Sequence, residues 1–178
     1  AVNQDAPLTV AGPEESVRKF LAECKRRRVA GKMLYIPSPF PTRAREGLKA
    51  ALYERLSHIK AEPPKMPFYS TATGKLLSAA TDLDYWYANM RLPVLFASAA
   101  KNAYADGFRH FLEIGPSPVL RSSMRDLFRN EQEAVATSPT LFNNDKEPED
   151  FTAARANAWQ SGWTIDLSKH FPHEFSRR

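Results

Sequence analysis

The sequence contains very little cysteine: among 178 residues, only Cys24 carries a thiol. A single cysteine cannot form an intrachain disulfide, so the disulfide-rich secreted scaffolds are excluded and a reducing cytoplasm is the expected compartment. Cys24 falls on the apolar side of an expected helix, which predicts a core thiol and not a reactive one.

Long apolar runs and targeting signals are also missing. No stretch approaches the ~18 consecutive apolar residues of a membrane-spanning helix, so we expect no membrane association. The first ten residues, AVNQDAPLTV, include neither an initiator methionine nor the basic and apolar parts of a secretory signal. This start is typical of the middle of a longer polypeptide.

The common catalytic and nucleotide-binding motifs are absent from the chain. It contains no G-x-S-x-G, no G-x-x-x-x-G-K-[ST] and no G-x-G-x-x-G. The histidines do not indicate a metal site. The HFPH stretch near the C-terminus has no further metal ligands close by, and we therefore expect no metal site. The four histidines are His58, His110, His170 and His173.

Positive charge exceeds negative charge by five, with 25 Lys and Arg against 20 Asp and Glu. The length suits one ordinary domain or two small ones. The clearest basic run, KRRR at residues 25–28, falls in the last turn of an expected helix, where it complements the helix dipole. Stacking aromatic residues do not alternate with these cations, so nucleic acid is not an expected partner. An anionic partner such as a CoA phosphate or an acidic carrier protein is left open.

The stretch FLEIGPSPVL, residues 111–120, is the nearest the chain comes to a strand followed by a nucleophile. A nucleophile elbow needs small residues around its serine and a backbone amide just after it. Here Pro118 removes that amide and Val119 replaces the final glycine. We therefore interpret Ser117 as a turn residue and helix cap.

The first third of the chain has the pattern of a β-α-β unit. We expect a strand at 8–11, a helix from Pro13 through the basic run, and a second strand at 31–36. A β-α-β unit of this kind is the first half of a small ferredoxin-like sandwich. The apolar face of its helix comprises Val17, Phe20, Leu21 and Cys24.

The remaining patterns alternate between helix and strand. AEPPK at 61–65 cannot be helical and marks a subdomain crossing. The stretches MPFYS and RHFLEI are apolar on both faces, which suits a central parallel sheet. We expect helices at 43–59, 82–90, 93–106, 118–128 and 149–161, strands at 66–70, 109–114, 140–142 and 163–167, a turn at Gly74, a polar connection at 129–140 and a helix stop at Gly162.

Four stretches occur in an order that identifies a resemblance: AVNQDAPLTVAGPEESVRKFLAEC, MPFYSTATGKLL, DLDYWYANMRLPVLFASAAKNAYADGFRHFLEIGPSPVL and LFNNDKEPEDFTAARANAWQSGWTIDL. Together they resemble the C-terminal half of the acyltransferase domain of type I polyketide synthases, a family related to malonyl-CoA:acyl carrier protein transacylases. The resemblance implies an α/β fold in three parts. These are a ferredoxin-like small subdomain at 1–62, part of an α/β-hydrolase-like parallel-sheet subdomain at 63–130, and a post-acyltransferase linker at 131–178 that packs on other protein.

In that family, a serine in G-H-S-x-G attacks an acyl-CoA with a histidine as its base. The resemblance implies that the serine lies upstream of the matched region, and Pro39 stands where the histidine is expected. A proline has no titratable group and cannot accept a proton. The same segment, with Ile36, Pro37 and Ser38, is implied to line the acyl pocket, and Asn89 stands where a backbone carbonyl orients the histidine.

Two functions follow from the resemblance. In the first, the chain is a degenerate or partial acyltransferase domain, without catalytic serine or histidine, that serves as a structural or docking element. In the second, it is half of a working transacylase completed by another chain or segment that carries G-H-S-x-G. No cofactor is expected to bind this chain itself; acyl-CoA and carrier-protein phosphopantetheine are implied as substrates. The implied partners are the remainder of an acyltransferase domain, a ketosynthase or other synthase domains, and an acyl carrier protein.

Overall fold

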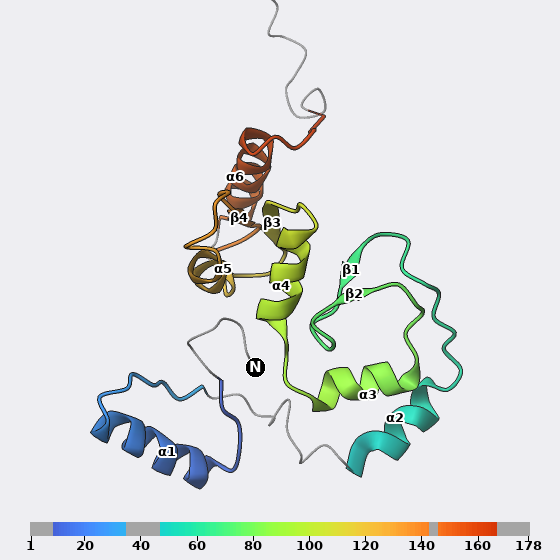
Figure 1. Cartoon of the computed structure of the whole chain (residues 1–178), viewed down its shortest axis with the longest axis vertical. Coiled ribbons are helices and arrows are strands. Elements are labelled where there is room, and N and C mark those ends of the chain that lie inside the picture. Colours follow the sequence, from blue (N-terminus) through green and yellow to red (C-terminus); the bar gives the residue numbers. More distant parts are fainter. Residues whose placement is uncertain (1–8, 35–46, 143–145, 167–178) are drawn as a thin grey trace, which may run out of the picture. The chain divides into compact units, whose positions relative to one another are not determined.

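The computed structural model describes residues 9–34, 47–142 and 146–166, and its elements are labelled in Figure 1. They are helical and β elements mixed along the chain, in accord with the expected α/β class. The chain divides into two compact units, a first that ends at Gly107 and a second that begins at Phe108.

The first helix, α1 (Glu14–Arg26), confirms the sequence prediction. Pro13 precedes it, Glu14 and Glu15 occupy its first turn, and basic residues occupy its last, as the helix dipole favours. None of its side chains is buried. Cys24 is accordingly half-buried and is not the core thiol that we expected.

The strands expected on either side of α1 are wrong in the part of the chain that the structure describes. Residues 9–12 and 31–34 form no β-ladder. After the helix the backbone turns back against α1, so closely that a Cβ on Gly31 would lie 2.7 Å from Leu21 Cδ2. Strands form only where a partner supplies the ladder, and these two segments meet none among the described residues.

The rest of the first unit combines three helices with a short hairpin. The stretch MPFYS was expected in a parallel sheet, and this prediction is wrong, because β1 pairs antiparallel with β2. The cause is the tight turn between them, in which Gly74 has φ +72 and its N–H donates to the Ser70 carbonyl. The elements are α2 (Lys49–Leu56), β1 (Phe68–Tyr69), β2 (Leu76–Leu77), α3 (Leu83–Arg91) and α4 (Phe96–Ala105).

Helix α4 packs on this hairpin through small residues. It begins at Phe96 and not near Pro93 as expected, because the Leu95 N–H bonds the Thr71 carbonyl at 2.7 Å and turns the chain away from the line of α3. The Asn102 amide donates to the Gly74 carbonyl at 2.6 Å, which ties the helix to the turn. The buried apolar residues here are Ala72, Ala97, Ala99, Ala100 and Ala103.

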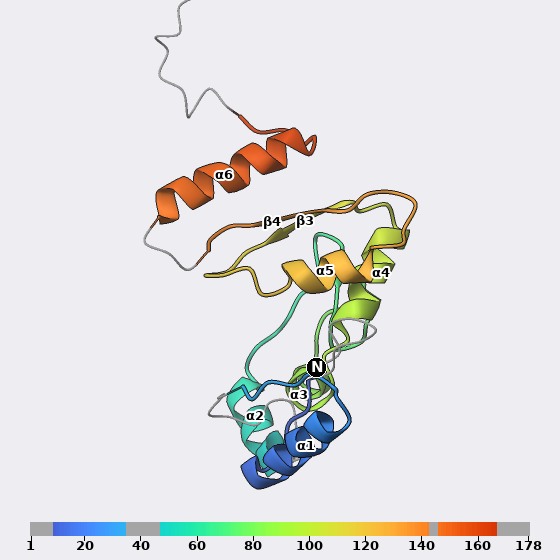
Figure 2. The same ribbon diagram turned by 90° about the vertical axis from the view of Figure 1, so that its left-hand side faces the viewer.

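The second unit is a three-layer arrangement around a two-stranded parallel sheet. Strand β3 (His110–Glu113) pairs in parallel with β4 (Ala136–Pro139), which confirms the parallel setting expected for RHFLEI. Helices α5 (Arg121–Leu127) and α6 (Glu147–Gln160) lie on opposite sides of the sheet, as Figure 2 shows. Under α5, the rings of Phe111 and Phe128 stack with centroids 6.0 Å apart.

Two strand predictions in this unit are wrong. The strand is at 136–139, inside the stretch expected as a polar connection, and not at 140–142. The last backbone bond between the two strands runs from the Thr140 N–H to the carbonyl of Glu113, the last residue of β3. Residues 163–166 form no strand either, since the Trp163 N–H bonds back to Ala158 of α6 after the predicted stop at Gly162, which has φ +90.

Candidate functional site

The four pocket candidates lie outside the described residues. Ile36, Pro37, Ser38 and Pro39 belong to the segment 35–46, so the assignment of Pro39 to the base position stays a prediction. Among the candidate site residues, only Asn89 falls on a described element.

Asn89 lies in the last turn of α3, where backbone carbonyls commonly lack a donor within the helix. In a helix, this carbonyl would accept the N–H of the residue four positions on. That residue is Pro93, which has no N–H, while the Leu92 N–H already bonds the Ala88 carbonyl at 2.8 Å. The usual helical donor to Asn89 is therefore missing, and its oxygen is suited to a donor from outside the helix. The proline four residues later was visible in the sequence and is the signal that could have found this.

Two side-chain contacts fix the start of α3. Asp82 caps the helix by accepting the Tyr85 N–H at 2.7 Å. The Tyr85 hydroxyl lies 2.9 Å from Ser70 Oγ, which is fully buried at the hairpin turn. The hairpin therefore sets the position of α3, and with it that of the Asn89 carbonyl.

A charged cluster joins α2 to α3. The Tyr53 hydroxyl donates to Asp84, and Lys49 Nζ lies 3.3 Å from Asp84 Oδ1. The hydrogen bond from Tyr53, followed by that from Lys49, lowers the pKa of the Asp84 carboxyl. The hydrogen bond to Asp84 in turn raises the pKa of both Tyr53 and Lys49. The cluster is exposed, so it orients the two helices and adds little stability.

The turn after β3 holds Ser117, and Glu113 and Thr140 organise it. The Glu113 carboxylate accepts the N–H groups of Val119 and Leu120 at 2.8 and 3.0 Å. Thr140 Oγ1 accepts the Gly115 N–H at 3.1 Å and lies 3.2 Å from the Glu113 carbonyl oxygen. Pro118 has no N–H, so the first two backbone N–H groups after Ser117 are those of Val119 and Leu120, and both donate to a carboxylate.

This geometry supports the interpretation of Ser117 as a turn residue. An oxyanion hole needs amides aimed at developing negative charge, and here a carboxylate occupies them. Sequence reasoning excluded the serine through Pro118 and Val119 but missed Glu113 and Thr140. They lie 27 residues apart, so no local pattern could have joined them.

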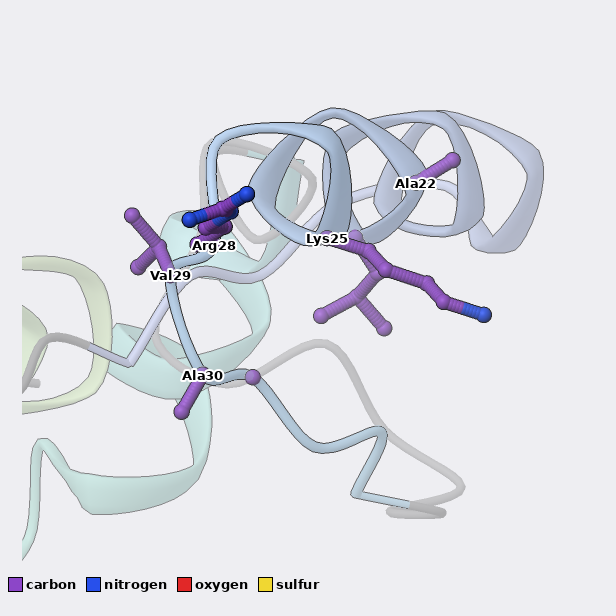
Figure 3. A pocket seen from close by; sticks show the side chains of 7 residues that line it. Ala22, Lys25, Arg28, Val29 and Ala30 are labelled. Atoms are coloured by element: carbon purple, nitrogen blue, oxygen red, sulfur yellow. The ribbon is translucent and has the colours of Figure 1, made fainter.

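A surface hollow of about 540 Å³ lies beside the C-terminal end of α1 (Figure 3). Arg26 and Arg27 of the basic run pair with Glu23 at 2.6 and 2.5 Å, while Lys25 and Arg28 line the hollow. The hollow is open and its charged side chains are exposed, so it has the form of a solvated groove and not of an enclosed ligand site. Its lining residues are Leu21, Ala22, Lys25, Arg28, Val29, Ala30 and Gly31.

The described residues contain no cluster of three or more metal-ligating side chains. They include His58 and His110, whereas His170 and His173 fall outside them. In the same part of the chain, no helix is both long and apolar enough to cross a membrane.

The profile of the acyl transferase domain family matches residues 1–164, and the chain belongs to this family. It is 32% identical over 170 residues to erythronolide synthase EryA2 of Saccharopolyspora erythraea, covering 94% of this chain and 5% of that synthase. It is 29% identical over 170 residues to mycoketide-CoA synthase of Mycobacterium tuberculosis, covering 93% of this chain and 4% of that protein.

Solved acyltransferase domains have the same fold. The domain from module 8 of the salinomycin polyketide synthase superposes with a TM-score of 0.83 at 25% identity, over 88% of this chain and 37% of that one. A loading acyltransferase from the avermectin modular polyketide synthase gives 0.75 at 26% identity, over 83% of this chain and 46% of that one. The chain thus corresponds to a part of a polyketide-synthase acyltransferase domain, and it spans less than half of either solved chain.

Proposed function

We propose that this chain is a partial acyltransferase domain, without serine elbow or base, that serves as a structural or docking element of a polyketide synthase. One observation carries the proposal: the chain matches the acyltransferase family over residues 1–164 and contains no G-x-S-x-G. The turn that comes nearest to this motif supports the proposal, because the amides after Ser117 are bonded to the Glu113 carboxylate.

The missing chemistry is that of acyl transfer. In the family that the chain resembles, a serine takes the acyl group from CoA, and the thiol of carrier-protein phosphopantetheine then removes it. Both steps need a base to accept a proton from the attacking group. With Pro39 at the base position, this chain contributes neither the nucleophile nor the base. Its own contribution would be the Asn89 carbonyl and the scaffold that holds it.

Surface composition supports the docking role. Most of the buried apolar side chains in the described residues are alanines, while many large ones are exposed. Large exposed apolar side chains in this number favour surfaces that other protein covers. The exposed residues include Phe20, Val29, Leu34, Ile59, Met66, Leu76, Trp86, Ile114, Val119, Phe142, Phe151, Trp159 and Trp163. The expected partners are the remainder of an acyltransferase domain, neighbouring synthase domains and an acyl carrier protein, in the cytoplasm.

The division into subdomains is part of the same proposal. A ferredoxin-like part at 1–62, a hydrolase-like part at 63–130 and a linker at 131–178 describe what the chain would become within a complete domain. Strand β3 of the hydrolase-like part pairs in parallel with β4, which lies in the proposed linker, and this supports a linker that packs on the domain. The segments 9–12 and 31–34, which form no β-ladder, would form the ferredoxin-like sheet once further strands are present.

The proposal predicts that the chain alone forms no acyl-enzyme. Incubation with malonyl-CoA or acetyl-CoA should leave its intact mass unchanged, because no activated hydroxyl is available to attack the thioester. The positive control is a complete acyltransferase domain treated in the same way. A stable adduct that maps to Ser117 or Ser38 would refute the proposal.

A second function is favoured by the Asn89 carbonyl, which Pro93 leaves without its helical donor. Such an acceptor suits an imidazole N–H, so the chain is also a candidate for half of a transacylase whose other chain carries G-H-S-x-G. Replacing Pro39 by His should then raise acyl transfer in the assembled complex, typically by about 10²–10⁴-fold, the contribution of a well-placed base. The readout is acyl loading of a carrier protein, followed by mass spectrometry.

The matched control for this experiment is Pro39→Ala. It removes the φ restriction of the proline without adding a base. The chain alone should stay inactive in all three forms, since it contains no G-x-S-x-G and a general base needs a hydroxyl within hydrogen-bond reach, about 2.6–3.2 Å. Equal activity of Pro39→His and Pro39→Ala in the complex would mean that residue 39 is not at the base position.

A further inference from the structure

Helices α2 and α3 contact each other in the first unit (Figure 1), and neither of them buries a side chain. The neighbouring helix α4, by contrast, buries four alanines where it packs on the hairpin. α3 is tied to the hairpin through the Tyr85 hydroxyl, 2.9 Å from the fully buried Ser70 Oγ. Burial of apolar surface is the main force that fixes one element on another, so α2 is held by packing less firmly than α4.

Polar and aromatic side chains join α2 to α3 instead. The Tyr53 hydroxyl donates to Asp84 Oδ1, and Lys49 Nζ lies 3.3 Å from the same oxygen. Lys49 Nζ also lies 5.2 Å from the ring centroids of Tyr53 and Tyr87, so each helix supplies one ring to the ammonium group. Two donors from α2 therefore converge on one carboxylate oxygen of α3. We call this group of side chains the α2–α3 cluster; its members are Lys49, Tyr53, Asp84 and Tyr87.

The connection that leaves α2 does not fix the helix by itself. Residues 59–64 form neither helix nor strand, and Pro63 and Pro64 prevent them from continuing α2. Because α2 has no buried side chain and is followed by an irregular segment, its position on α3 depends on the α2–α3 cluster.

The α2–α3 cluster is open to solvent, since the side chains of Lys49 and Asp84 are 49% and 72% accessible. Exposed ion pairs contribute little stability and are weakened by salt. A contact of this kind orients two helices and can also release them at small cost. Hinge motions between packed elements need a contact that separates easily in this way.

We propose that the α2–α3 cluster is a charge-dependent clasp, which holds α2 on α3 in one orientation and releases it when the ion pair is screened or broken. α2 is the last helix before the expected subdomain crossing, and α3 carries the Asn89 carbonyl. The clasp therefore sets the orientation of the preceding part of the chain relative to that carbonyl. The inference goes beyond the proposed function and does not rest on it, because its observations and its tests lie within the chain.

The first test measures one distance in the full chain. Donor and acceptor dyes are attached at Arg55→Cys on α2 and Lys75→Cys on the hairpin, both at exposed positions, in a Cys24→Ser background. Time-resolved energy transfer should give a narrow distance distribution in low salt. In about 1 M NaCl the distribution should become at least about 2-fold wider, because the Debye length falls to about 3 Å.

Two outcomes of the salt experiment would overturn the proposal. A distribution that is equally narrow in high salt would mean that α2 is fixed by other contacts. A wider distribution accompanied by a loss of the helical circular dichroism signal would mean that α2 unfolds and does not move as a helix.

Charge exchange tests the ion pair directly. Lys49→Glu and Asp84→Lys should each widen the distribution at least about 2-fold in low salt, because like charges then face each other. The double variant restores opposite charges and should restore the narrow distribution, as expected for two residues that act through each other. A double variant as wide as either single variant would contradict the clasp.

The matched control is Glu62→Lys. Glu62 lies 3.6 Å from Lys65 and is as exposed as Asp84, at 78% against 72%, but it belongs to neither helix. The same gain of positive charge should leave the distribution unchanged there. Widening equal to that of Asp84→Lys would mean that net charge and not the clasp sets the distance, and would overturn the proposal. An acyl-enzyme formed by the chain would refute the proposed function and leave these distances as expected.

Discussion

Replacing Phe128 by alanine is expected to lower the unfolding free energy of the second unit by about 3–5 kcal/mol, the usual cost of removing a buried aromatic ring. Phe128 is 7% accessible and stacks on Phe111 of β3. With Met124 and Leu127, it supplies the large apolar side chains buried in this unit. The structure around a removed buried ring relaxes only in part, so a cavity would remain. Urea unfolding followed by circular dichroism measures the loss.

The matched control is Phe151→Ala on α6. Its side chain is 52% accessible, so the same change of residue should cost no more than about 0.5 kcal/mol, as for other surface substitutions. Similar losses for the two variants would mean that the packing of α5 on β3 does not stabilise the unit. A normal urea midpoint for Phe128→Ala would contradict the three-layer arrangement directly.

Gly74→Ala is expected to cost the first unit about 2–5 kcal/mol, for two separate reasons. With φ +72, an L-residue pays about 1–2 kcal/mol for the left-handed conformation. The added Cβ would also lie 2.8 Å from Ser98 Cβ on α4, and overpacking of this kind costs typically about 1–3 kcal/mol. The measurement is again the urea midpoint of the purified chain.

Gly107→Ala separates these two costs. Gly107 also has a positive φ, +97, but a Cβ there would meet nothing within 4 Å. It should therefore show the backbone cost alone and be clearly less damaging than Gly74→Ala. Equal losses would mean that α4 moves aside without cost, and that the hairpin turn does not fix the position of the helix.

The helices were largely determined by the sequence itself. Local signals mark their ends: Pro13 before α1 with two glutamates in its first turn, Asp82 as the cap of α3, and Gly162 after α6. Such signals act within one turn of a helix, so they can be interpreted without knowledge of the fold. The family is determined in the same way, by the order of stretches such as YWYANMRLPVLF and FLEIGPSPVL, which the match over residues 1–164 confirms.

The strands were decided by tertiary structure. Residues 136–139, ATSP, have no strand pattern and contain a proline, and yet they form β4 because β3 offers a ladder beside them. Residues 9–11 have a strand pattern and form none. Strand preference depends on the neighbouring strand more than on the residue itself, so a sequence that supplies only part of a sheet cannot reveal which strands will pair.

In the candidate site too, one part is determined by the sequence alone and another by the tertiary structure. The sequence alone excluded Ser117 as a nucleophile, through Pro118 and Val119, because both act on adjacent atoms. Only the tertiary structure brought Thr140 to the turn after β3 and directed the Glu113 carboxylate at the amides of Val119 and Leu120. These contacts join residues up to 27 positions apart, and their existence depends on the parallel pairing of β3 with β4, which no local pattern encodes.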